Sequence, residues 1–411
     1  MSILSIPLDI PDVEVIRVEQ DQHQFIITVK STLNYTQCRK CGKVITKRHG
    51  EDKPILLRHL PIFDQPVYLK IHPVRYQCLD CKNNPTTTQK MPWYSPRRQS
   101  TLAYEDYLLR QLINSTVTDV HRKERVGYEM IEGIVDRHVD TQVNWDSLTR
   151  LECLGIDEIA LKKGHQDFVV IVSAKVDGDL HILAVLKDRK KATVKAFLQS
   201  IPSPLAATIQ SYCCDMYDGY INAAKEVFGC RVKIVIDRFH VAKHYRDGLD
   251  TLRKREMKRL KKTLSEQDYE SLKGVMWALR KRPERLKKED NALLKRLFGY
   301  SPLLKQAYHY QHQLTKLFDA NIPRQVAARR MRRWVNRVKN SGITCFDKFI
   351  KTLNKHWPII LNYFNDRVTS GFVEGLNNKI KVIKRRCYGI FNIEKLYQRI
   401  FLDLEGYNLY A

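Results

Sequence analysis

Hydrophobic and polar residues repeat with two different periods along this chain of 411 residues, one typical of strands and one typical of helices. Around residues 66–78, and again from Leu151 to His240, apolar residues stand at every second position or in short unbroken runs, as in β-strands. Between these regions, and for more than a hundred residues after His240, the apolar spacing fits amphipathic helices. The pattern therefore predicts a multidomain α+β protein.

The strand-rich segment that starts at Leu151 predicts a single sheet. Three strand-like runs form a meander, with VDGD as the hairpin turn between the last two, and helix and strand then alternate. In chain order the segments are LECLGIDEIAL, DFVVIVSAKV, LHILAVLK, the helix KATVKAFLQSIP, the buried strand AATIQSYCCD, the helix GYINAAKEVF and the buried strand RVKIVIDRFH. The order β-β-β-α-β-α-β is that of an RNase H-like α/β core with a mixed sheet.

Residues 105–139 follow the proline-spaced basic linker MPWYSPRRQS and have the apolar spacing of three short helices. Breaks are expected near Asn114–Ser115 and at Gly127. The last segment, Tyr128–Val139, would present one face to a DNA groove, which predicts a helix-turn-helix. A plain helical linker is the alternative.

The helical region after His240 is strongly basic. Residues 251–340 contain 25 Lys and Arg against 8 Asp and Glu, while Trp277, Trp334 and scattered Leu, Val and Phe supply apolar faces. We therefore expect a folded, all-α insertion. Any one of its charge runs is ordinarily a solvated helix face, but the excess of 17 positive charges favours nucleic acid.

The composition of the whole chain supports a polyanionic partner. Hydrophobic residues make up 43%, as in a globular protein, and the formal net charge is +26. Basic residues that neutralise the phosphates of a nucleic acid release its counterions, and this release favours binding. The competing interpretation is a basic face that binds acidic membranes. Neither an apolar run of membrane-spanning length nor a signal-peptide core is found. We expect a cytoplasmic protein, in a reducing compartment where the cysteines form no disulfide framework.

Four of the ten cysteines form two CxxC knuckles, CRKC and CLDC, separated by 36 residues. Such knuckles can converge on one tetrahedral zinc ion, for which thiolates are preferred ligands. Redox cysteines or coincidence are the alternatives. The predicted ligands of one structural Zn²⁺ in a ribbon-like finger are Cys38, Cys41, Cys78 and Cys81.

Two aspartates follow apolar runs of the predicted sheet. Asp157 is expected at the end of the first strand, in GIDEIA, and Asp215 just past the fourth, in YCCDMYDGY. Either one alone would more often be a turn or N-cap residue. On neighbouring strands they are better explained as a carboxylate pair, whose repulsion divalent cations relieve. Oxygen ligands select Mg²⁺ or Mn²⁺.

A third carboxylate, Glu374, begins the basic segment VEGLNNKIKVIKRR. A helix over 373–386 would bring it back to the same edge of the sheet. Asn377, Asn378 and Lys381 share its helix face, at i+3, i+4 and i+7. The alternative is an acidic residue that suits a helix N-terminus. The basic residues expected to hold the DNA backbone are Lys379, Lys384, Arg385 and Arg386.

Four segments resemble the ISL-type transposases of bacterial insertion sequences, the ISL-three family, and the resemblance covers nearly the whole chain. These segments are IDEIALKKGHQDFVVIV, SYCCDMYDGY, VIDRFHVAKH and VEGLNNKIKVIKRRCYG. The resemblance implies that Asp157, Asp215 and Glu374 are a DDE triad that holds two Mg²⁺ ions. It also relates Asp237 and His240, in DRFH, to an Asp-x-x-His motif near the active site. The alternative interpretation is that Asp237 is an ordinary acidic residue at a strand end and that His240 is a histidine packed in the core.

The resemblance implies cleavage at terminal inverted repeats and strand transfer into target DNA, by a homodimer or larger assembly. A non-catalytic zinc-finger and helix-turn-helix regulator, or an RNase H-fold nuclease for repair or junction resolution, are the alternative functions. The expected domains are a zinc-binding domain (1–92), a helix-turn-helix (100–145), the first part of the catalytic core (150–245), the basic insertion (246–362) and the C-terminal part of the core with the third acid (363–411).

Overall fold

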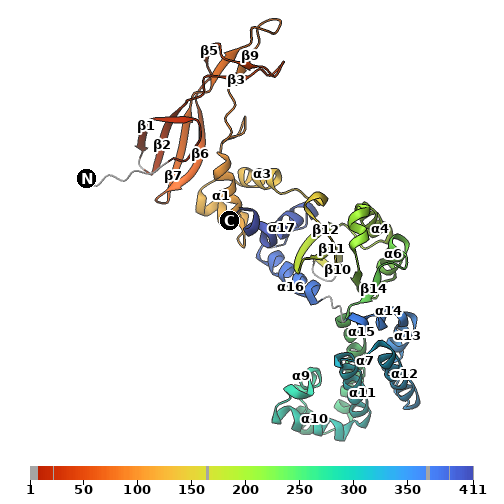
Figure 1. Cartoon of the computed structure of the whole chain (residues 1–411). Coiled ribbons are helices and arrows are strands. Elements are labelled where there is room, and N and C mark those ends of the chain that lie inside the picture. The colour runs from red at the N-terminus through yellow and green to blue at the C-terminus, as the bar shows by residue number, and fades with distance from the viewer. Residues whose placement is uncertain (1–7, 22, 163–165, 367–370, 388, 411) are drawn as a thin grey trace. The chain divides into compact units, whose positions relative to one another are not determined.

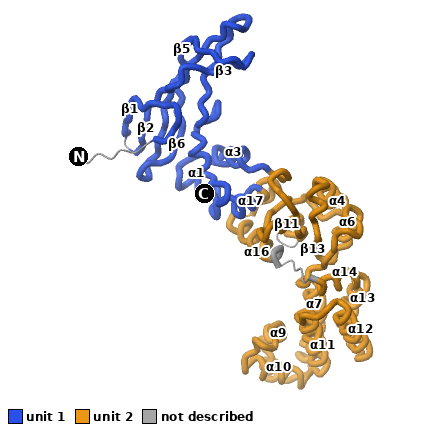
Figure 2. Tube along the Cα trace, in the orientation of Figure 1, with its two compact units in different colours: residues 1–140, 398–411 blue, residues 141–397 orange. Residues whose placement is uncertain are grey.

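The computed structural model describes residues 8–21, 23–162, 166–366, 371–387 and 389–410. The chain divides into two compact units (Figure 2): unit 1 holds residues 1–140 and 398–411, and unit 2 holds residues 141–397. Each unit has its own buried hydrophobic residues. Within the described ranges, no helix is both long and apolar enough to cross a membrane.

A four-stranded sheet forms much of unit 1. Its strands, in spatial order, are β1 (Val13–Asp21), β2 (Gln24–Ser31), β7 (Gln65–Ile71) and β6 (Ile55–Ile62). β2 and β7 run parallel, and the two outer pairs are antiparallel. Alternate residues of β7, Val67, Leu69 and Ile71, are buried in a core that also holds Leu57 and Trp93. The alternation in PVYLKIH therefore reflects a sheet with one buried face.

Shorter strands surround the cysteines. The antiparallel pair is β3 (Thr36–Gln37) and β4 (Val44–Ile45), and the three-stranded sheet is β5 (Arg48–Glu51), β8 (Val74–Gln77) and β9 (Thr86–Thr88). Cys38 and Cys78 are buried beside Val74 and Tyr76.

Three helices of unit 1 form where the spacing predicts them: α1 (Leu102–Leu112), α2 (Val117–Glu124) and α3 (Tyr128–His138). Thr101 and Thr116 cap α1 and α2, each accepting a hydrogen bond from a backbone N–H of the first turn. Buried Glu105 of α1 accepts hydrogen bonds of 2.6 Å from Arg137 and His138, which ties α3 to α1. The helix breaks expected near Asn114 and Gly127 are confirmed.

Unit 2 contains a five-stranded mixed sheet (Figure 1). Its spatial order is β12 (Asp179–Leu186), β11 (Gln166–Val176), β10 (Cys153–Lys162), β13 (Ser211–Cys214) and β14 (Lys233–Ile236). β10, β11 and β12 form an antiparallel meander, whereas β13 and β14 are parallel to β10. The helices are α4 (Lys191–Ser200), α5 (Ser203–Thr208) and α6 (Asp218–Phe228), with a 3₁₀ turn η1 at Trp145–Ser147.

Three local expectations are wrong. The predicted strand AATIQSYCCD is shorter, because residues 203–208 form α5, with Pro204 in the first turn where a missing N–H costs nothing. The strand RVKIVIDRFH ends at Ile236, because Asp237 caps the next helix by accepting a hydrogen bond from the Phe239 N–H. Asp157 lies inside β10 and not at its end, because β10 stays paired with β11 as far as Lys162.

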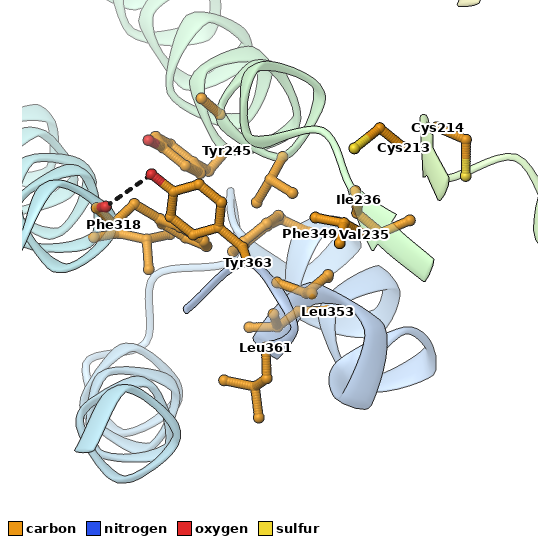
Figure 3. Close-up of a cluster of buried hydrophobic side chains, with 14 of the residues drawn as sticks. Cys213, Cys214, Val235, Ile236, Tyr245, Phe318, Phe349, Leu353, Leu361 and Tyr363 are labelled. Carbon is orange, nitrogen blue, oxygen red and sulfur yellow. Dashed lines mark hydrogen bonds between the residues drawn. The ribbon is translucent and has the colours of Figure 1, made fainter. Parts of the chain in front are cut away.

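The basic region after β14 is helical throughout its described length, apart from connecting turns. Its helices are α7 (Arg238–Thr263), α8 (Glu266–Glu270), α9 (Val275–Arg280), η2 (Pro283–Arg285), α10 (Lys288–Tyr300), α11 (Pro302–Asp319), α12 (Arg324–Asn340), α13 (Asp347–Lys355), α14 (Trp357–Leu361) and α15 (Tyr363–Asp366). Figure 3 shows Val235 and Ile236 of β14 near Phe349 and Tyr363 from these helices. The Tyr363 hydroxyl donates to the Phe318 carbonyl at 3.5 Å. Sheet and helices therefore share one hydrophobic core.

The last two helices are α16 (Gly371–Arg386) and α17 (Ile393–Tyr410). α16 lies against β10, with Leu376, Ile380 and Ile383 buried on one helical stripe. The final part of α17 belongs to unit 1, where Leu402 packs among the residues of α1–α3.

Candidate active site and metal centre

The parallel ladder between β10 and β13 places two acids in equivalent positions. Gly155 pairs with Cys213 at the last register position of this ladder, and Asp157 and Asp215 each follow two residues later. Side chains two residues apart in a strand lie on the same face, so β10 presents Asp157 on the face of Gly155. Asp215 lies just past the end of β13, and both acids line one cleft.

Burial raises the pKa of Asp215. The Tyr217 N–H, 2.8 Å from Oδ1, and the nearby His240 oppose this shift, whereas Glu158 and Asp157 add to it. The charged form of Asp215 is therefore costly in the protein alone, and a bound cation would stabilise it.

Asp157 is held by partners distant in sequence. Its Oδ2 accepts a hydrogen bond from Nδ2 of Asn377 in α16, and its Oδ1 accepts one from the Glu158 N–H at 2.7 Å. Asn377 is buried, and its own Oδ1 has no hydrogen-bond partner among the described residues. Glu374 belongs to α16, three residues before Asn377, but its side chain lies outside the described residues.

His240, in the first turn of α7, lies close to both Asp157 and Asp237, the N-cap residue of this helix. Nε2 of His240 is 3.7 Å from Oδ1 of Asp157 and 3.7 Å from Oδ2 of Asp237. Burial lowers the pKa of His240, but the nearby carboxylates of Asp157, Asp237 and Asp215 outweigh it, and the pKa is raised. The structure thus brings the two residues of DRFH to the aspartate pair.

The acids open into a cleft of about 1110 Å³ with basic walls. Lys381, Lys384 and Arg385 of α16 line it. Nζ of Lys384 donates to the Ala160 carbonyl, and burial lowers the pKa of this lysine. The α16 residues Asn378, Lys379 and Arg386 are described but lie outside the cleft lining.

Further cleft residues were not predicted from the sequence. Arg189 forms an ion pair with Glu158, with Nη1 and Oε2 3.3 Å apart. The Cζ atom of its guanidinium lies 5.6 Å from the ring centroid of Phe168 and 5.1 Å from that of Tyr217. Glu158 directly follows Asp157, and because neighbouring side chains of a strand point to opposite faces, its place in the same cleft could not be predicted from the spacing. His244 and Asp247 also line the cleft and follow His240 at i+4 and i+7, which is one face of a helix.

The four cysteines of unit 1 converge as their spacing predicts. Their sulfur atoms all lie within 4.8 Å of one another, with Cys38 and Cys81 at 3.9 Å and Cys41 and Cys78 at 3.8 Å. Tetrahedral coordination with Zn–S bonds near 2.3 Å places sulfurs about 3.8 Å apart, so the cluster fits one zinc ion. Among the side chains that the structure describes, it is the one group of three or more such ligands close enough to share an ion.

Comparison with known proteins gives the family. Residues 154–400 match a family model described as "Transposase", and residues 89–139 match one described as "Helix-turn-helix domain of transposase family ISL3". The chain belongs to the ISL3 transposase family. The resemblance inferred from the sequence is therefore confirmed, and so is a helix-turn-helix in the region of α1–α3.

Two relatives of this ISL3 transposase align along most of their length. The transposase for insertion sequence element IS1001 of Bordetella parapertussis is 26% identical over 381 residues, which cover 92% of this chain and 91% of that protein. The transposase for insertion sequence element IS1557 of Mycobacterium tuberculosis is 23% identical over 393 residues, 90% and 86% of the two chains. The protein is thus an insertion-sequence transposase, and the regulator and repair-nuclease alternatives find no support among these matches.

Proposed function

We propose that the cleft carries out DNA cleavage and strand transfer, with Asp157, Asp215 and Glu374 as its DDE triad. The observation that carries this proposal is the hydrogen bond from Asn377 to Asp157, since it brings the helix of Glu374 to the strand of the first acid. The equal register of Asp157 and Asp215 supports it. The sheet order β12-β11-β10-β13-β14, with the last two strands parallel to β10, supports an RNase H-like core.

The residues around the triad would prepare it for phosphoryl transfer. Two divalent cations, Mg²⁺ or Mn²⁺, held by the three carboxylates would activate the attacking oxygen and neutralise charge on the scissile phosphate. Asn377 orients Asp157 through Oδ2, and His240, when protonated, would place a positive charge close to both Asp157 and Asp237. Lys381, Lys384 and Arg385 would hold phosphates of the DNA in the cleft.

The remaining parts would bind the DNA substrate. The finger with one Zn²⁺ on Cys38, Cys41, Cys78 and Cys81 and the helix-turn-helix would recognise terminal inverted repeats. Lys379 and Arg386 would contact the DNA backbone outside the cleft, and Asn378 stays a predicted auxiliary residue of the active site. Coordinated cutting of two ends favours a dimer or larger assembly on bacterial DNA in the cytoplasm. The proposed domains keep the bounds 1–92, 100–145, 150–245, 246–362 and 363–411.

Substitution of single acids tests the proposal. Asp157→Asn, Asp215→Asn and Glu374→Gln should each retain binding to terminal-repeat DNA and lose Mg²⁺-dependent cleavage. Asp177→Asn is the matched control, since Asp177 is 58% exposed in the turn after β11. Cleavage by purified Asp157→Asn protein would overturn the triad. Strand joining on pre-cut ends separates transposition from a nuclease that only cuts.

A further inference from the structure

Helix α12 carries a continuous basic surface. Its 17 residues, RQVAARRMRRWVNRVKN, include no acid. One stripe is buried in the core: Ala327, Met331, Trp334, Val335 and Val338. The other positions include the exposed residues Arg324, Arg329, Arg330, Arg332, Arg333, Arg337 and Lys339. The apolar stripe fixes the helix, and the charges face outward.

Part of this surface forms one wall of a groove against α11. The groove has a volume of about 800 Å³, and Lys316, Arg330, Arg333, Trp334 and Arg337 are among its lining residues. Its walls are tied together, because Nε1 of Trp334 donates to the Tyr310 carbonyl at 2.9 Å and the Tyr310 hydroxyl donates to the Arg337 carbonyl at 3.3 Å. The basic side chains therefore project from a fixed frame.

The groove concentrates positive charge without neutralising acids. Lys316, Arg330, Arg333 and Arg337 make no ion pair with the residues that the structure describes. Asp319, the sole acid of α11, is bound by Arg238 and lies 3.8 Å from Arg282. Four cations that share one groove repel each other unless an anionic ligand neutralises them.

We propose that this α11–α12 groove binds the phosphate backbone of duplex DNA at a site separate from the cleft. Arg330, Arg333 and Arg337 lie on one helix face and span about 10 Å of its axis, which equals roughly three base-pair rises along the axis of a DNA duplex. The proposal rests on the proposed function, which makes DNA the substrate.

The neighbourhood of the groove favours DNA over a membrane surface. A helix that binds a membrane inserts an apolar face between lipids. The apolar stripe of α12 is instead buried in the core, and no large hydrophobic residue of α11 or α12 is exposed. The ligand expected here is therefore a polyanion held through its phosphates, without base readout.

The salt dependence of DNA binding tests the groove. A triple variant with Arg330→Gln, Arg333→Gln and Arg337→Gln should reduce the slope of log K against log salt concentration by about 2–3 on a 40-bp duplex, since each lost phosphate contact contributes about 0.9. The control Lys258→Gln, Lys261→Gln and Lys262→Gln removes the same charge from exposed positions of α7 and should change the slope by less than about 1. Equal changes in the two variants, or none in the first, would overturn the proposal.

Two further variants guard against misfolding. Replacing the three arginines by lysine keeps the charge and should preserve the slope, and Arg333→Gln alone should reduce it by about 0.9. If the triple glutamine variant lost binding to phosphatidylserine vesicles while its DNA binding stayed unchanged, the groove would be a membrane site and the proposal of duplex DNA as its ligand would be wrong. All these variants keep the three acids of the triad. An unchanged salt slope would therefore reject the groove as a DNA site without touching the proposed triad. Cleavage by the Asp157→Asn protein would likewise reject the triad without touching the groove.

Discussion

Asn377 of α16 donates a hydrogen bond to Asp157 of β10, across 220 residues of sequence. Asn377 is buried and Asp157 is partly exposed, and Lys381, four residues further along α16, lines the cleft in which Asp157 lies. The hydrogen bond therefore holds α16, which lies near the C-terminus in sequence, against Asp157 in the sheet of unit 2.

Removing the amide of Asn377 should impair catalysis more than binding. Asn377→Ala frees Oδ2 of Asp157 and leaves a small cavity, at a cost of about 1–3 kcal/mol in the free energy of unfolding. Asn377→Asp places a second carboxylate beside Asp157, and because a divalent cation relieves the repulsion between carboxylates, it should lower the Mg²⁺ concentration needed for half-maximal cleavage. Cleavage titrated with Mg²⁺, with thermal melting and DNA binding as controls, checks both. A wild-type Mg²⁺ profile in Asn377→Asp would contradict this prediction.

Arg189→Lys keeps a positive charge but loses the flat contact with Phe168 and Tyr217. Two such ring contacts contribute roughly 1–2 kcal/mol to holding the guanidinium, so we expect cleavage to slow about tenfold. Arg150→Lys is the control, since Arg150 is also half exposed and ion-paired but lies outside the cleft lining. Equal rates for the two variants would show that the rings do not matter for cleavage.

Zinc removal should unfold a limited part of unit 1. Purified protein should contain one zinc per chain, and Cys81→Ser should lose it, whereas Cys230→Ser, at an exposed cysteine, should retain it. Hydrogen exchange should then rise over β3, β4, β5, β8 and β9, because the metal supplies much of the stability of such small sheets. The sheet of unit 2 should keep its protection. Metal analysis that finds zinc in both variants would reject these ligands.

Gly248 and Gly299 form a matched pair of helical glycines. A Cβ at Gly248 in α7 would lie 2.4 Å from the Cys345 carbonyl oxygen, so Gly248→Ala should destabilise unit 2 by about 1–3 kcal/mol or more. At Gly299 in α10 nothing lies within 4 Å, so Gly299→Ala should be neutral or stabilise by up to about 1 kcal/mol. Urea unfolding of both variants measures the difference. Similar free energies would contradict the close packing of α7.

Burial of His59 should make unit 1 sensitive to acid. Burial lowers the pKa of His59 to about 4, and its Nδ1 lies 2.9 Å from the Thr101 hydroxyl that caps α1. The unfolded chain takes up this proton below about pH 6.5 while the folded chain does not, so stability is lost as pH falls from 6.5 towards 4. The loss should be on the order of 2 kcal/mol.

Hydrogen exchange of α1, compared between wild type and His59→Gln at each pH, measures this effect. The difference in protection between the two proteins should change with pH only inside that window. A constant difference from pH 7 to pH 4 would assign the acid sensitivity to other groups.

Hydrophobic periodicity and residue chemistry predicted many helices and strands and the cysteine cluster of this protein, because these features depend on residues that are close together in the chain. The helices of 102–138, the meander of β10–β12 and the four converging cysteines follow from such patterns. The family resemblance likewise lies in short motifs. Local patterns are less reliable at element ends, which is why Asp237 was placed in a strand when it caps α7.

Contacts between distant residues decided the rest. Asp157 lies within a strand because β11 pairs beyond it, and Asn377 meets it because α16 packs on β10. Arg189 joins the cleft through Glu158 and two rings, and the groove exists because Trp334 ties α12 to α11. No local pattern encodes these pairings, since each partner is specified by the packing of elements that the chain brings together only on folding.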